Sequence, residues 1–76
     1  GISDNGTFEG AWTALRSGGN MVVNVVTIEG EMHLYDLQEK HGGELVRIDV
    51  STLTPVGSLR AMKPRMAVLQ WRVKKP

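Results

Sequence analysis

Residues 21–28, with the sequence MVVNVVTI, form the longest nearly apolar run in the chain. Its valines and isoleucine favour extended backbone. Apolar residues occupy both alternating faces, which is typical of a strand with neighbours on both sides. Asn24 and Thr27 interrupt the run, which is far shorter than the roughly 20 residues that span a bilayer. The stretch therefore predicts a buried strand and no membrane segment.

The segment before this strand has the spacing of an amphipathic helix. Apolar residues recur three and four positions apart, at Phe8, Ala11, Trp12 and Leu15. Thr7 can cap the start, and the glycines at 18–19 can end it. We expect a helix over residues 8–17. Gly10 within it costs up to about 1 kcal/mol relative to alanine, so an irregular turn is the alternative.

Residues 31–41 are compatible with two structures. As a strand they would form a hairpin with the first strand across Glu29-Gly30. As a helix they consist of good helix formers, place Leu34, Leu37 and His41 on one face, and end at the glycines 42–43. The helix is favoured slightly.

Residues 44–51 alternate in the manner of a half-buried strand. Val46, Ile48 and Val50 share one face, whereas Arg47 and Asp49 share the other. The following residues 54–57, Thr-Pro-Val-Gly, have the composition of a turn.

The last segment, residues 64–75, again fits a strand or a helix. Ala67, Leu69, Trp71 and Val73 alternate with polar residues as in a strand, yet Pro64 could begin a helix. Because 76 residues suffice for one core, we predict a single domain over residues 1–76. Its class is α+β: small and compact, with short, mainly antiparallel β-strands and one or two short helices.

Side chains that could carry chemistry show no spacing of a known site. His33 and His41 with Asp36 and Glu39 match no compact metal motif, and the chain has no cysteine. The glycine pairs lack the residues of phosphate-binding loops. We therefore expect a monomeric, non-enzymatic protein with no catalytic residues, no cofactor and no metal.

Charge is strongly segregated along the chain. Residues 1–50 contain eight acidic and three basic side chains, whereas residues 51–76 contain six basic and none acidic. Such asymmetry suggests a charged partner. The expected basic pole consists of Arg60, Lys63, Arg65, Arg72, Lys74 and Lys75, and the expected acidic pole of Glu29, Glu31, Asp36 and Glu39.

Each pole predicts a different kind of partner. The basic residues flank Trp71 and could bind nucleic acid through phosphates and base stacking. In the competing interpretation, Trp71 is a core residue and the charges solvate the outer face. The acidic residues could steer the domain into the basic cleft of a nuclease or another nucleic-acid-processing enzyme and inhibit it.

In its length, its first residue Gly1, its lack of cysteine and its charge layout, the chain resembles the internal proteins of T-even bacteriophages. The resemblance implies a trimmed product that is carried in the virion interior, injected into the host cytoplasm, and there inhibits a host restriction endonuclease. Nonspecific DNA contact is a further expectation. Without the resemblance, the expected location is cytoplasmic.

Overall fold

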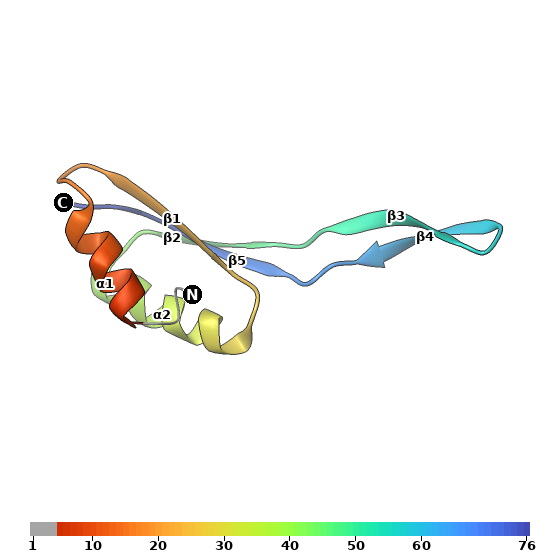
Figure 1. The fold of residues 1–76 in the computed structure, drawn as a ribbon, viewed down its shortest axis with the longest axis horizontal. Helices are drawn as coiled ribbons and strands as arrows, with labels where there is room; N and C mark the ends of the chain where they lie inside the picture. The colour runs from red at the N-terminus through yellow and green to blue at the C-terminus, as the bar shows by residue number, and fades with distance from the viewer. Residues whose placement is uncertain (1–4) are drawn as a thin grey trace.

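The molecule consists of a three-stranded sheet with two helices on one side and a β-hairpin that projects from one end of the sheet (Figure 1). The computed structural model describes residues 5–76. Its elements are α1 (Asn5–Ala14), β1 (Asn20–Val25), α2 (Ile28–His41), β2 (Glu44–Ile48), β3 (Ser51–Val56), β4 (Leu59–Pro64) and β5 (Val68–Lys74). The α+β class with antiparallel strand pairs is confirmed.

The C-terminal strand lies in the middle of the sheet, whose order is β1-β5-β2. β5 pairs antiparallel with both neighbours, with Leu69 opposite Val25 and Val68 opposite Ile48. Since both neighbours run against β5, β1 and β2 run parallel to each other. Their carboxyl ends therefore lie at the same edge of the sheet, the edge that faces the hairpin.

The core lies between the sheet and the helices. Trp71 is fully buried there, and its indole Nε1 donates to the carbonyl of Gly42 at 2.8 Å, as a buried tryptophan requires. A Cβ atom at Gly43 would lie 2.6 Å from the carbonyl oxygen of Arg72, so only glycine fits beside the strand. The buried apolar residues are Phe8, Val23, Val25, Leu34, Leu37, Leu69, Trp71 and Val73. Trp71 is thus a core residue and has no face free for a base.

Helix α2 has a defined signal at each end. The Thr27 hydroxyl accepts a hydrogen bond from the backbone N–H of Gly30 at 3.0 Å, which caps the first turn. Gly42, with φ of 74°, ends the helix. The helical interpretation of residues 31–41 is confirmed, and the same cap ends the strand predicted over residues 21–28 at Val25.

Helix α1 lies earlier in the chain than predicted. It spans Asn5–Ala14, so residue 7, the predicted cap, lies within the helix and not before its first residue. Its C-terminal carbonyls are bound by a lysine from the other end of the chain, because Lys75 Nζ donates to the oxygens of Trp12 at 2.7 Å and Leu15 at 2.8 Å. A cation is favourable at this negative end of a helix.

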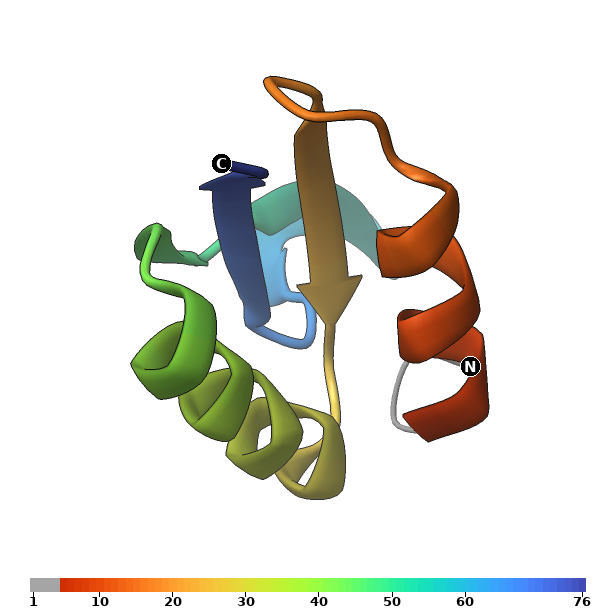
Figure 2. The same ribbon diagram turned by 90° about the vertical axis from the view of Figure 1, so that its left-hand side faces the viewer.

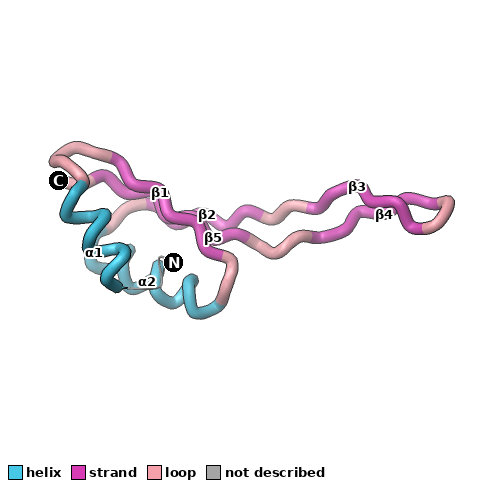
Figure 3. The backbone as a smooth tube through the Cα atoms, viewed as in Figure 1, coloured by secondary structure: helices cyan, strands magenta, loops and turns pink. Residues whose placement is uncertain are grey.

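The two faces of the sheet differ in what covers them. In Figures 1 and 3 both helices lie on one side, and in the end-on view of Figure 2 α1 lies beside β1 and α2 toward β2. On the opposite face no described helix packs. There Gln70 donates to Asn24 at 2.8 Å, and Arg72 binds Gln70 at 2.6 Å and Glu44 at 3.3 Å.

The prediction for residues 44–51 assigned the wrong face to the core. Leu45 packs against the buried cluster, and Arg47 on the same face reaches α2. Val46 and Ile48 therefore lie on the face without helices, where they are partly buried. The alternating pattern predicted the wrong face because the charged Arg47 lies on the side of the helices, where it forms an ion pair with Glu31.

The hairpin formed by β3 and β4, residues 51–64, is called the arm. It gives the molecule dimensions of 54 × 22 × 19 Å. The strands pair around Val56 and Leu59, so the turn is Gly57-Ser58, with φ of 61° at Gly57. The four residues of the turn are therefore 56–59, two positions after the predicted 54–57. Pro55 lies in β3, and proline is tolerated in a strand that has a free edge.

Of the two structures predicted for residues 64–75, the strand is the one observed, as β5. Leu69, Trp71 and Val73 face the core, in agreement with the alternating pattern. Among residues 5–76, neither helix is long and apolar enough to cross a membrane.

Candidate functional site at the root of the arm

Three chain connections meet where the arm leaves the sheet. Val26 follows β1, Val50 joins β2 to β3, and Arg65 and Met66 join β4 to β5. The backbone N–H of Arg65 donates to the carbonyl of Val50 at 2.9 Å, which ties the two strands of the arm together at its base. This hydrogen bond fixes the position of the Arg65 backbone, from which the side chain extends.

A cleft of about 290 Å³ lies between these connections, and we call it the arm-root cleft. Its lining residues are apolar except for one arginine: Val26, Val50, Arg65, Met66 and Val68. An adjoining cleft of about 360 Å³ shares Arg65 and Met66 and adds Thr52, Lys63 and Pro64. The combination of apolar walls with few polar groups is typical of ligand sites.

The position of the arm-root cleft has a topological cause. Val26 and Val50 follow the carboxyl ends of the parallel strands β1 and β2. In open α/β sheets, ligands bind outside the carboxyl ends of the parallel strands, and β1, α2 and β2 form such a strand-helix-strand unit. Among the described residues, the linings of the two adjoining clefts contain two cationic residues, Arg65 and Lys63, and no acidic one. The site therefore suits an apolar ligand that carries a negative charge.

A second cleft, of about 300 Å³, lies between α1 and α2 and has a different character. Its lining carries charges of both signs: Glu9, His33, Asp36, Leu37, Lys40 and His41. His33 Nε2 is buried there and has no hydrogen-bond partner among residues 5–76. Within residues 5–76, no group of three or more histidine or acidic side chains could hold a metal ion.

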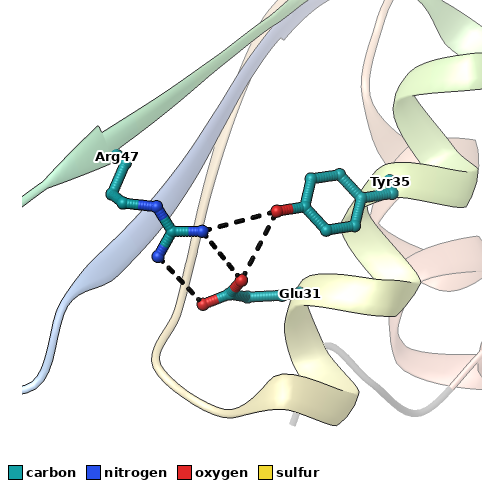
Figure 4. Close-up of polar contacts among 3 residues, drawn as sticks. All are labelled: Glu31, Tyr35 and Arg47. Carbon is teal, nitrogen blue, oxygen red and sulfur yellow. Dashed lines mark hydrogen bonds and ion pairs between the residues drawn. The ribbon is translucent and has the colours of Figure 1, made fainter.

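The most developed side-chain network joins α2 to β2 (Figure 4). Arg47 binds both carboxylate oxygens of Glu31, at 3.0 and 3.4 Å, and the Tyr35 hydroxyl lies 3.4 Å from each partner. The hydrogen bond from Arg47 lowers the pKa of Glu31 below its ordinary value. Because every group in the network is satisfied within it, its role is to hold the helix on the sheet edge.

The structure does not bring the six predicted basic residues together. Arg60 and Lys63 lie on the arm and Arg65 at its root, while Lys74 and Lys75 lie at the opposite end of the molecule (Figure 1). The remaining one, Arg72, forms an ion pair with Glu44. Charge segregation along the sequence is thus not a single pole in space.

The four predicted acidic residues all belong to α2 but serve different surroundings. Glu31 is paired with Arg47, and Asp36 lines the cleft between the helices. Glu29 and Glu39 are exposed.

Sequence reasoning missed the apolar part of the arm-root cleft. Val26 and Val50 were assigned to the predicted strands, and Met66 was given no role. The usable signal was the order strand, helix, strand over residues 21–51, which favours two parallel strands with their carboxyl ends at one edge. Arg65 was selected, but for its charge alone.

Comparisons with known proteins identify the family. A family model described as the precorrin methyltransferase domain matches residues 1–75. A precorrin-6Y C(5,15)-methyltransferase [decarboxylating] from Sinorhizobium is 44% identical over 71 residues, which cover 93% of this chain and 17% of that protein. The enzyme of the same name from Mycobacterium tuberculosis is 36% identical over 75 residues, covering 99% of this chain and 19% of that protein.

Two solved structures have the same fold. A putative precorrin-6Y C5,15-methyltransferase targeted domain from Corynebacterium diphtheriae superposes with a TM-score of 0.93 at 39% identity, covering 100% of this chain and 45% of that one. The C-terminal domain of precorrin-6Y C5,15-methyltransferase from Rhodobacter capsulatus gives 0.83 at 33% identity, covering 95% and 39%. The chain thus spans less than a fifth of the curated relatives and less than half of the solved domains.

These matches overturn the functional predictions. The chain is not a phage internal protein, and its predicted roles as a restriction-endonuclease inhibitor and as a nucleic-acid-binding module are wrong, as is the expected nuclease partner. The prediction of a non-enzymatic protein is wrong as well, because the relatives are named as methyltransferases. Short length, lack of cysteine and charge layout are shared by many unrelated small chains. The matched sequence over residues 1–75 shows that the chain belongs to the precorrin methyltransferase domain family.

Proposed function

We propose that this chain forms part of an enzyme that transfers methyl groups to a precorrin, in the manner named for its relatives, at C5 and C15 with loss of a carboxyl group. The observation that carries the proposal is the match over residues 1–75 together with 44% identity to a named methyltransferase. The TM-score of 0.93 to a solved domain of that name supports it.

Within such an enzyme, this segment would supply one end of the sheet and the arm. Within residues 5–76, β1 pairs with a neighbour, β5, on one side only, and its residue Val22 and the following Val26 are exposed and apolar. An apolar strand with a free edge readily accepts another strand. The relatives' solved domains are more than twice as long as this chain, so further structure is available to cover it.

Methyl transfer also needs a methyl donor, and the described glycine pairs do not fit one. The backbone of Gly18 and Gly19 is hydrogen-bonded to that of Lys75, at 2.7 and 2.8 Å. The space beside Gly43 is filled by Arg72 and Trp71. We therefore assign no described residue to the donor.

The test is a methyl-transfer assay of the full polypeptide that the gene encodes, with precorrin-6Y and an isotope-labelled methyl donor. We expect label in the precorrin and a product that has gained two methyl groups and lost carbon dioxide, as the relatives' name states. Folded protein that leaves precorrin-6Y unlabelled would contradict the proposal.

A further inference from the structure

We propose that Arg65 binds a carboxylate of the precorrin substrate in the arm-root cleft, while the apolar walls of the cleft contact one edge of the ring. The inference rests on the proposed function and deepens it, since it names the substrate-binding group. Three observations support it: the position of the cleft, the lack of an acidic partner for Arg65 among the described residues, and the chemistry of the ligand.

The arm-root cleft lies beyond the carboxyl ends of the parallel strands β1 and β2, which is the position where open α/β sheets with parallel strands bind ligands. The backbone hydrogen bond from Arg65 to Val50, 2.9 Å long, joins the two connections that line the cleft. Arg65 is therefore presented from a fixed point of the backbone, next to the apolar walls.

The Arg65 guanidinium has no acidic partner among the described residues. The ion pairs of residues 5–76 are Arg47 with Glu31 and Arg72 with Glu44. Arg65 is solvent-exposed, and the residues around it in both clefts include no aspartate or glutamate. A planar guanidinium in this state can bind a carboxylate through two parallel hydrogen bonds.

The walls of the cleft suit an apolar ring. Val26, Val50, Val68 and Met66 supply them, and Met66 is 71% exposed, far more than a core methionine. Burial of such surface by a ligand is favourable by roughly 25 cal/mol per Å² of apolar area. A volume of about 290 Å³ is at the lower limit for ligand sites. The cleft therefore holds an edge of a macrocycle and not the whole ring.

The ligand must combine these two features. A precorrin is a tetrapyrrole ring, and the relatives' name states a decarboxylation, so their substrate carries a carboxyl group. The cleft between the helices is a poorer candidate, because Glu9 and Asp36 line it and would repel a carboxylate. The arm-root cleft has the opposite sign of charge and apolar walls.

The experiment compares Arg65→Gln with Arg60→Gln in the full polypeptide. Both substitutions remove one exposed positive charge near the arm, but Arg60 is paired with Pro55 in the hairpin and lines neither cleft. Binding of precorrin-6Y is measured without methyl donor, and turnover is measured at saturating substrate. Thermal unfolding of each variant shows that the fold is retained.

We expect Arg65→Gln to raise Kd about ten-fold or more, the effect of losing a charge-assisted hydrogen bond. The kcat should stay within about three-fold, because a group that binds substrate and transition state equally affects affinity and not turnover. The Kd of Arg65→Lys should lie between those of the wild type and Arg65→Gln, since lysine keeps the charge and loses the planar geometry. Arg60→Gln should bind as the wild type does.

Each contrary outcome has a separate meaning. Wild-type affinity in Arg65→Gln, or an equal loss in Arg60→Gln, would overturn the assignment of Arg65 even if the enzyme methylates precorrin-6Y. Binding that depends on Arg65 without any methyl transfer would refute the proposed function and leave the assignment standing. A wild-type protein that does not bind precorrin-6Y would refute both.

Discussion

At the scale of single residues, Trp71 connects the middle strand to the end of α2. Its ring is fully buried among Phe8, Leu34 and Leu37, and its Nε1 reaches the Gly42 carbonyl at 2.8 Å. The sequence suggested two roles for this residue, and burial decides between them. A side chain with no accessible surface cannot stack on a ligand.

Replacing Trp71 with phenylalanine tests the value of this hydrogen bond. Trp71→Phe leaves the Gly42 carbonyl without its donor and opens a small void, so we expect a loss of about 1–3 kcal/mol in the free energy of unfolding. The measurement is urea denaturation. Trp12→Phe is the matched control, because Trp12 is only partly buried and stacks on Phe8. An equal loss in both variants would argue against a specific role of the hydrogen bond.

Glu31 makes a prediction about pH. Its pKa is lowered in the folded protein, chiefly by the hydrogen bond from Arg47. The ionised form is thus favoured by folding, and its contribution is present above the unfolded pKa, near the ordinary value of 4.5. The contribution is lost as the pH falls through the lowered folded value.

Glu31→Gln should therefore flatten the acid limb of the stability curve. The variant should be less stable than the wild type at pH 7, and the difference should shrink as the pH falls below the unfolded value. Urea midpoints over a pH series measure this. Glu39→Gln, an exposed residue of the same helix, should leave the shape unchanged. A curve for Glu31→Gln parallel to that of the wild type would show that the pair does not couple folding to protonation.

At the scale of elements, the arm is stabilised differently from the sheet. Its strands pack chiefly on each other, and their apolar residues Leu53, Leu59 and Met62 are exposed by 57, 73 and 61%. A two-stranded hairpin alone is marginally stable in water. Its register therefore depends strongly on the turn at Gly57.

Substitutions at Gly57 should act on the arm alone. Its φ of 61° is left-handed, so Gly57→Ala should cost about 1 kcal/mol. We expect faster amide hydrogen exchange in residues 51–64 and unchanged exchange in β5. Ser58→Ala is the control, because Ser58 lies in the same turn and has no positive φ. Loss of protection throughout the sheet would mean that the arm and the sheet unfold as one unit.

The sequence predicted the elements that depend on local signals and misplaced those that depend on tertiary contacts. Local signals succeeded: β-branched residues identified β1, and good helix formers with a glycine stop identified α2. Tertiary contacts overrode the pattern elsewhere. Lys75 closes α1 from the far end of the chain, and the Arg47 ion pair places the charged face of β2 toward the helices.

At the scale of the whole molecule, the site arises from long-range pairing. Val26, Val50 and Arg65 are far apart in sequence and meet because β5 inserts between two parallel strands. Composition contains no information about that insertion. The sequence therefore showed how many charged residues the chain has, but not where they lie in the folded molecule. The order strand, helix, strand was visible and would have placed two of these three residues at one edge.

The central claim is that this chain supplies the fold and the cleft of a precorrin methyltransferase domain. The most direct measurement replaces the matching 71 residues of the Sinorhizobium enzyme with this chain and assays methyl transfer to precorrin-6Y. We expect a folded chimera that methylates precorrin-6Y and whose Arg65→Gln variant binds precorrin-6Y more weakly. A folded chimera that transfers no methyl group, or whose Arg65→Gln variant binds precorrin-6Y equally well, would contradict this claim.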